Sequence, residues 1–187
     1  MYVIYRSVAL TAALLLLYGC GSGKSADDLP PTCPILGVLS DAAHVRFYQE
    51  GSGREQSDVA YELEFIRGEL RECNKDEDTL SSDIRFDIVA RKGPAGAEDA
   101  TFTYFVSILG PDSKVVSKEL HEHSVDFKSD KPEVRFSIEK EGIKITPPEG
   151  KDGLGYEILI GFQLSREQLE LNRARGQTVT EPAVMMK

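Results

Sequence analysis

The sequence DIRFDIVAR, residues 83–91, decides the fold class of this chain because apolar and polar side chains alternate along it. Its even-numbered residues, from Ile84 to Ala90, are all apolar, whereas Asp83, Arg85 and Asp87 are charged. Successive side chains of a β-strand point to opposite faces of the sheet. The stretch therefore predicts a strand with one face in a core and the other face in water.

The same period of two recurs along much of the chain from His44 onward. Alternating apolar residues occupy 59–65, 102–108, 134–138 and 156–164. The turn sequence 110–113 (GPDS) predicts a hairpin between the 102–108 strand and a strand at 114–123. Glu141-Gly142 is expected to make a second hairpin, between the 134–138 strand and a short strand at 143–145. Gly68 interrupts the run 59–73 and predicts a bulge or bend.

About seven to nine short strands with turns between them favour an all-β fold, namely an antiparallel, immunoglobulin-like β-sandwich. The chain has no tryptophan, which antibody-type cores contain, so the expectation concerns the two-sheet architecture. One short C-terminal helix is also expected. Ser165 and Gln168 have capping-box spacing, and Gly176 can end the helix. We expect this helix to pack on one end of the sandwich.

The two ends of the chain differ in composition from this region. A positive charge at Arg6, an apolar run at 8–17 and small residues before Cys20 are typical of a secretory signal peptide, and the run is too short to span a bilayer. We therefore expect a signal peptide at 1–19, a flexible tether at 20–32, the β-sandwich domain at 33–176 and a disordered tail at 177–187.

The segment Leu17-Tyr18-Gly19-Cys20 resembles the lipobox of bacterial lipoproteins. The resemblance implies that the Cys20 thiol takes a diacylglycerol, that cleavage precedes Cys20, and that the new N-terminus is acylated. Several acyl chains hold a protein durably on a membrane. Gly21 and Ser22 follow the cysteine where an aspartate often marks retention in the inner membrane. The resemblance therefore favours the periplasmic face of the outer membrane.

The sequence 161–173 (GFQLSREQLELNR) resembles the end of a group of uncharacterised envelope lipoproteins of Gram-negative bacteria. The similarity covers residues 33–173 and implies no known activity.

The charge of the chain limits the kinds of partner that we expect, and its cysteine content predicts a disulfide. The chain carries 22 basic and 31 acidic side chains, a net charge of −9, so nucleic acid is not an expected partner. Membrane contact is expected through the lipid alone, because anionic headgroups repel a negative surface.

With Cys20 lipidated, Cys33 and Cys73 remain, and we expect them to form a disulfide in an oxidising compartment. Two free thiols or a metal pair are the alternatives.

The best candidate for a chemical site is His121-Glu122-His123, because residues i and i+2 of a strand share a face and could bind one metal ion. A third ligand is not evident in the sequence, although His44 and Asp126 are candidates to approach the pair. An exposed polar strand explains the same residues, so no metal and no other cofactor is expected. Residues 74–78 (NKDED) open like an EF-hand loop, but the glycine and glutamate that such a loop needs later are missing. No G-x-S-x-G nucleophile motif occurs.

These observations lead to two hypotheses for function. The first is a non-enzymatic, lipid-anchored periplasmic domain that binds or supports another component of the cell envelope, most simply an envelope protein. The alternative is an envelope metal-binding protein or enzyme that uses His121 and His123. Either could be built on a β-sandwich, because function belongs to the site and not to the fold.

Overall fold

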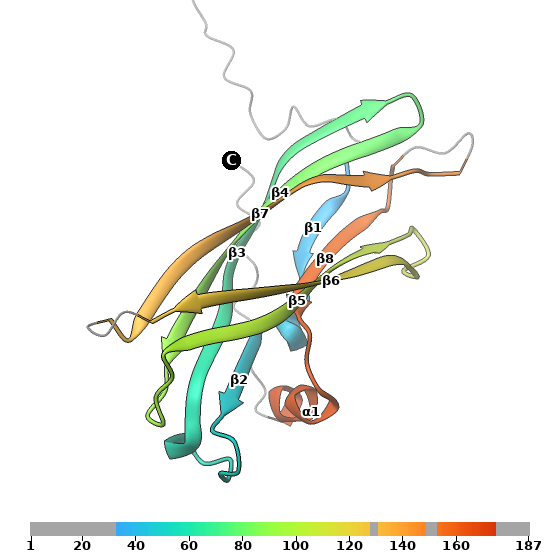
Figure 1. Cartoon of the computed structure of the whole chain (residues 1–187). Coiled ribbons are helices and arrows are strands. Elements are labelled where there is room, and N and C mark those ends of the chain that lie inside the picture. The colour runs from blue at the N-terminus through green and yellow to red at the C-terminus, as the bar shows by residue number, and fades with distance from the viewer. Residues whose placement is uncertain (1–32, 128–130, 149–152, 175–187) are drawn as a thin grey trace, which may run out of the picture.

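The computed structural model describes residues 33–127, 131–148 and 153–174. Within these ranges eight strands form two four-stranded sheets, with the orders β1-β8-β5-β6 (sheet A) and β2-β3-β4-β7 (sheet B) (Figure 1). The strands are β1 (Ile35–Val38), β2 (His44–Tyr48), β3 (Val59–Asp76), β4 (Thr79–Lys92), β5 (Asp99–Leu109), β6 (Val115–Asp126), β7 (Glu133–Ile145) and β8 (Glu157–Phe162). Two short 3-10 helices, η2 (Ser40–Ala42) and η3 (Gln56–Asp58), and the helix α1 (Arg166–Ala174) complete the described part of the chain.

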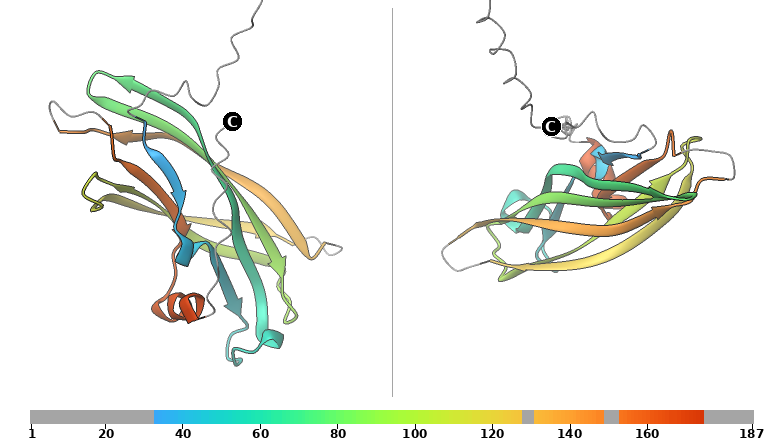
Figure 2. Two further views of the ribbon diagram at one scale, coloured as in Figure 1. Left: turned by 180° about the vertical axis from the view of Figure 1, so that it is seen from behind. Right: turned by 90° about the horizontal axis from the view of Figure 1, so that it is seen from above.

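The predicted all-β sandwich is confirmed, and Figure 2 shows its two layers. The even-numbered residues of β4 are buried from Leu80 to Ala90, as the alternation in this strand requires. Phe86 of sheet B packs against Tyr104 of sheet A with the ring centroids 5.3 Å apart, and Phe65 packs against Phe162 at 4.5 Å. Each such buried side chain contributes about 1.5–3 kcal/mol, so the core between the sheets is the main stabilising feature of the fold.

The sequence did not reveal β1, which pairs in parallel with β8. The sheets are therefore antiparallel except for this one pair. Leu39, just after β1, continues the contact by donating its N–H to the carbonyl of Ile160 at 2.8 Å. Because η2 then leads the chain into β2, the first two strands belong to different sheets. A four-residue parallel strand has no turn signal beside it, so local sequence patterns miss it.

The prediction of a hairpin at Glu141-Gly142 is wrong, because β7 continues through both residues. The pairing with β4 shifts between Ser82 and Ile84, so two residues of β7 lie opposite Asp83. Gly142 has a φ of 66°, and its N–H donates to Asp83 Oδ1 at 2.8 Å. The glycine therefore serves a β-bulge, which uses the same positive φ as many turns.

The prediction for Gly68 needs a smaller correction. The register of β3 shifts on both sides of this residue, between Phe65 and Arg67 and between Leu70 and Glu72, while Gly68 itself pairs with Phe86. A Cβ at Gly68 would lie 3.3 Å from Leu36 Cδ2. The glycine thus lets β1 cross close to β3, and the bulges flank it.

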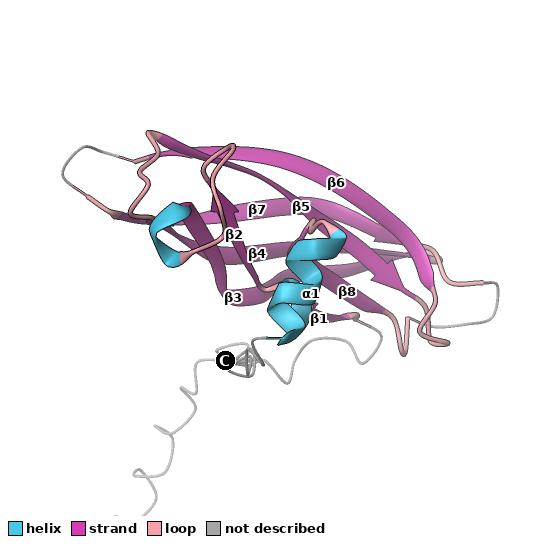
Figure 3. Ribbon diagram, turned by 90° about the horizontal axis from the view of Figure 1, so that it is seen from below, coloured by secondary structure: helices cyan, strands magenta, loops and turns pink. Residues whose placement is uncertain are grey.

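The other turn and the helix follow the predictions. Ser113 N–H donates to the Gly110 carbonyl at 2.9 Å, which closes the β5–β6 hairpin. The N–H of Ser165 donates to Gln168 Oε1 at 2.9 Å, and the N–H of Gln168 donates to Ser165 Oγ at 3.1 Å, which makes the expected capping box. Figure 3 shows α1 across one end of the sandwich, whereas its expected cap, Gly176, lies outside the described residues.

Asn172 attaches α1 to the sandwich. Its side chain is 9% exposed and donates to the carbonyls of Asp41 and His44, at 3.0 and 2.7 Å. One buried amide thus satisfies a carbonyl of η2 and the first carbonyl of β2, which fixes the helix against this edge of sheet B.

Candidate functional site

The two histidines of the candidate site share one face of β6, as predicted, and this face lies over β7. Both side chains are half-buried, whereas Leu120 and Glu122 beside them are exposed. The ring of His123 stacks on Phe136 of β7 with the centroids 5.3 Å apart and an interplanar angle of 13°. His121 Nδ1 lies 3.2 Å from Lys140 Nζ, also of β7. The pair therefore connects the inner faces of two edge strands.

The remaining candidate ligands lie elsewhere. His44 is on β2, at the opposite edge of sheet B, where its Nε2 lies 3.5 Å from Glu62 Oε2. Asp126 is an exposed residue of β6 whose position in the alternation puts it on the other face from His121 and His123. Within the described residues no group of three or more His, Cys, Asp or Glu side chains could hold a metal ion.

The surroundings of His121 favour its neutral form. Burial lowers the pKa of this imidazole, the positive charge of Lys140 lowers it further, and Glu119 acts in the opposite direction from 3.6 Å. A lysine ammonium can only donate, so Nδ1 accepts a hydrogen bond from Lys140 and the ring proton is on Nε2. This arrangement gives His121 a structural contact between the two sheets.

A cleft of about 460 Å³ opens beside this contact, between β6 and β7. Apolar side chains from β5 and β7 and charged side chains from β6 and β7 line it together. The lining residues are Val106, Ile108, Ser117, Glu119, His121 and residues 140–144. Lys140 and Lys144 were not predicted as neighbours of His121, because the pattern predicted that the chain reverses at Glu141. The cleft depends on the uninterrupted β7.

The outer face of sheet B is covered by paired charges. Arg46 Nε lies 2.8 Å from Glu62 Oε2, and Arg91 lies 2.9 Å from Glu64 and 3.1 Å from Glu133. A hydrogen bond from His44, then one from Arg46, lowers the pKa of Glu62 from 4.5 to about 2, against the effect of its burial. These side chains form a polar layer across the strands.

The outer face of sheet A is different in kind. Among the described residues seven large apolar side chains are exposed, and six of them belong to the strands of sheet A or to segments next to these strands. They are Ile35, Leu39, Val115, Val116, Leu120 and Leu154, and the seventh is Ile66 on β3. Lys118 lies among them, with its Nζ 4.5 Å from the centre of the Phe105 ring and 2.9 Å from Gln163 Oε1. Sheet A thus presents exposed apolar side chains among charged ones such as Lys118 and Glu122, whereas the outer face of sheet B presents ion pairs.

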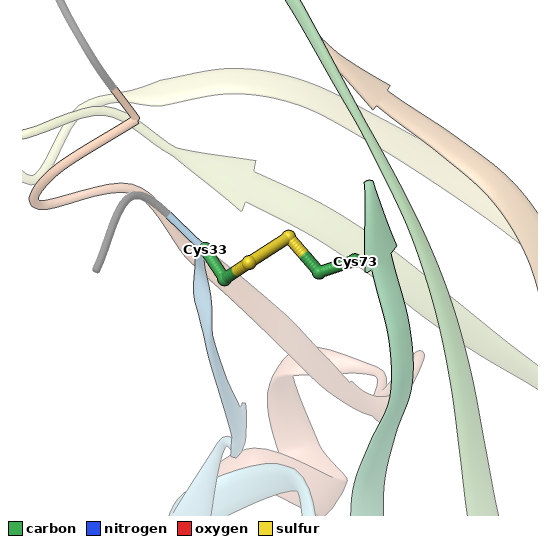
Figure 4. Close-up of a disulfide and its surroundings, with 2 residues drawn as sticks. All are labelled: Cys33 and Cys73. Carbon is green, nitrogen blue, oxygen red and sulfur yellow. A yellow bond between two sulfur atoms is a disulfide. The ribbon is translucent and has the colours of Figure 1, made fainter. Parts of the chain in front are cut away.

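A disulfide joins the two sheets on the side opposite β6 and β7. The sulfur atoms of Cys33 and Cys73, the pair that the sequence singled out, are 2.09 Å apart (Figure 4). Cys33 precedes β1 in sheet A, and Cys73 lies on β3 in sheet B. The bond therefore links the start of the described domain to the longest strand.

The acidic segment 74–78 forms the tip of the β3–β4 hairpin. Asp76 pairs with Thr79, so only Glu77 and Asp78 lie outside the ladder, and Glu77 has a φ of 51°. These residues are exposed. The segment is a tight turn between two strands.

Several predicted features lie outside the described residues: the signal peptide 1–19, Cys20, the tether 20–32 and the tail 177–187. No helix in the described part of the chain is long and apolar enough to cross a membrane. Comparisons of the chain with models of known protein families and with curated proteins found no match.

Proposed function

We propose that this chain is a lipid-anchored, non-enzymatic domain of the periplasm that binds an envelope protein through the outer face of sheet A. The observation that carries the proposal is the difference between the two outer faces. Ile35, Val116 and Leu120 are 65%, 62% and 56% exposed on sheet A, whereas sheet B presents ion pairs. Ile35 lies on β1 and Val116 and Leu120 lie on β6, the two edge strands of sheet A. Exposed large apolar side chains that gather on one sheet are a feature of interaction sites.

The position of the histidines favours this function over the metal-dependent alternative. His121 contacts Lys140, His123 stacks on Phe136, and His44 lies beside Glu62 at the far edge of sheet B. Packing and ion pairing account for the position of each imidazole. In this proposal the histidines have a structural role, and the exposed apolar side chains of sheet A bind the partner.

The binding face can be tested by photo-crosslinking in cells. A photoreactive amino acid at Ile35 is expected to form adducts with another envelope protein. Ile66 is the matched control, because it is an exposed isoleucine on sheet B. Equal adducts from both positions, or none from Ile35, would contradict the proposed face.

The anchor is supported by the lipobox-like segment and is tested separately. The Cys20→Ser substitution is expected to release the protein from membranes or to leave it unprocessed, because the acyl chains would be missing. A processed Cys20→Ser protein that still fractionates with membranes would exclude lipid anchoring at this residue. Separation of inner and outer membranes would check the outer-membrane location.

A further inference from the structure

Of the four strands at the edges of the two sheets, β6 is the one that is both long and regular. β1 and β2 have only four and five residues, and side chains of α1 bind the carbonyls of Arg46 and His44 in β2. β7 has the bulge at Gly142. β6 has 12 residues, and its pairing with β5 is unshifted from Ser117 to Asp126. Figure 2 shows β6, in yellow, along a rim of the molecule. Long, regular edges can pair with another strand.

The direction of the main chain in β6 limits how a further strand can pair. Phe127, which follows β6, donates its N–H to the Glu98 carbonyl at 2.8 Å. In an antiparallel ladder both main-chain groups of a residue point to the same side, and the side alternates along the strand. The odd-numbered residues of β6 therefore bond to β5, and the even-numbered residues direct their N–H and C=O groups outward.

The sequence of β6 complements itself when a second β6 runs antiparallel with Leu120 opposite Leu120. In this register the outward-directed Lys118 lies opposite Glu122, and each of these pairs occurs twice. On the inner face Glu119 lies opposite His121, within the part of β6 whose pairing with β5 is unshifted. Opposite charges and apolar pairs directly across two strands stabilise a ladder.

From this geometry we propose that the protein forms a homodimer in which the β6 edges of two copies pair antiparallel around a two-fold axis at Leu120. The pairing would join the two copies of sheet A into one eight-stranded sheet. Lys118 would exchange its contact with Gln163 for one with Glu122 of the partner subunit. The two apolar outer faces would then lie side by side on one surface, so the dimer goes beyond the proposed function and would enlarge the proposed binding face.

Charge reversal tests the register in the full chain. Two differently tagged copies are produced in the same cells, solubilised together and captured through one tag. When both copies carry Lys118→Glu, or both carry Glu122→Lys, like charges face each other twice and recovery of the second copy should fall about tenfold. When one copy carries Lys118→Glu and the other Glu122→Lys, both charge pairs are restored and recovery should return to the wild-type level.

Glu157→Lys is the matched control, because this exposed residue on β8 of sheet A makes the same charge change away from β6. It should leave recovery unchanged. Recovery that is lost when both copies carry the same reversal and regained when they carry opposite reversals requires direct contact between the copies. A third protein that bridged two copies would not produce this compensation. No recovery between wild-type copies, or recovery that ignores the reversals, would overturn the proposal.

A cysteine crosslink gives a second, independent reading of the register. Opposite residues in a hydrogen-bonded antiparallel pair have Cα atoms about 5.5 Å apart, which suits a disulfide. Leu120→Cys in the full chain should therefore give a covalent dimer on mild oxidation. Glu122→Cys should not give one. In this register residue 122 lies opposite residue 118 of the partner subunit, so the two new thiols would be four residues apart along the ladder, about 14 Å. The unsubstituted chain controls for its own cysteines. A crosslink at Glu122→Cys in place of Leu120→Cys would exclude the register.

Discussion

At the scale of single residues, the fold depends on polar side chains that satisfy each other at the edges and outer faces of the sheets. Glu62 illustrates this, because its carboxylate meets His44 at 3.5 Å and Arg46 at 2.8 Å. Its side chain is 21% exposed, so water screens these contacts only in part. Such a group stabilises the fold when it is ionised and loses this effect when it is protonated.

We therefore predict that Glu62→Gln lowers the free energy of unfolding by about 1–3 kcal/mol at pH 7. The folded-state pKa of Glu62, about 2, is below its usual value of 4.5. Its contribution is thus present above pH 4.5 and lost as the pH falls toward 2. Denaturation of both proteins across this range checks the prediction, and the difference between them should shrink at low pH.

Glu64→Gln is the control for this measurement. Glu64 contacts Arg91 at 2.9 Å, but its side chain is 47% exposed. An exposed ion pair contributes about 0–1 kcal/mol, so this variant should change stability less than Glu62→Gln does. Equal losses from both substitutions would show that burial of Glu62 does not matter.

The packing role assigned to His123 gives a prediction that separates it from a metal ligand. His123→Ala removes the ring that stacks on Phe136 and should cost about 1 kcal/mol. His123→Phe keeps an aromatic ring at the same place and should retain most of the stability. Thermal unfolding of the two variants, with and without added zinc, checks this. Equal damage from both substitutions together with stabilisation of the wild type by zinc would support a metal site.

At the scale of elements, the strands with strict alternation were predictable and their exceptions were not. β4 and β5 follow their patterns because each has one face on the core and one face away from it. Glu141-Gly142 misled because a bulge and a turn need the same positive φ, and only the partner strand distinguishes them. β1 was not predicted because its partner β8 lies about 120 residues away in the sequence. The cleft beside His121 was not predicted because the pattern placed a chain reversal at Glu141, whereas β7 continues through this residue and lines the cleft.

The bulge makes its own prediction. Gly142 has a φ of 66°, and a Cβ at this position would meet no atom within 4 Å. The cost of a substitution should therefore come from the backbone conformation alone. Gly142→Val should lower stability by about 1–2 kcal/mol, and Gly142→Asn should lower it less, because asparagine tolerates the left-handed region better. Equal effects of valine and asparagine in denaturant unfolding would contradict this account of the bulge.

At the scale of the whole molecule, the sandwich is closed on one side and open on the other. The disulfide joins the sheets beside β1, α1 covers the start of β2, and Gly68 lets β1 approach β3. On the opposite side β6 and β7 are joined by side-chain contacts and leave a cleft. The closed side fixes the relative position of the sheets. The open side leaves the β6 edge accessible for the pairing proposed above.

The closed side carries the last prediction, which concerns the Cys33–Cys73 disulfide. The bond spans a sequence separation of 40 residues and links the two sheets. By the chain-entropy argument, a loop of this length stabilises the fold by about 4 kcal/mol, because it restricts the unfolded chain. The double variant Cys33→Ala/Cys73→Ala should therefore unfold at a clearly lower denaturant concentration than the wild type. In the Cys20→Ser full chain, a thiol reagent should label no cysteine after denaturation without a reductant, and two cysteines after reduction. Labelling of two thiols before reduction would show that the two sheets are held together without this bond.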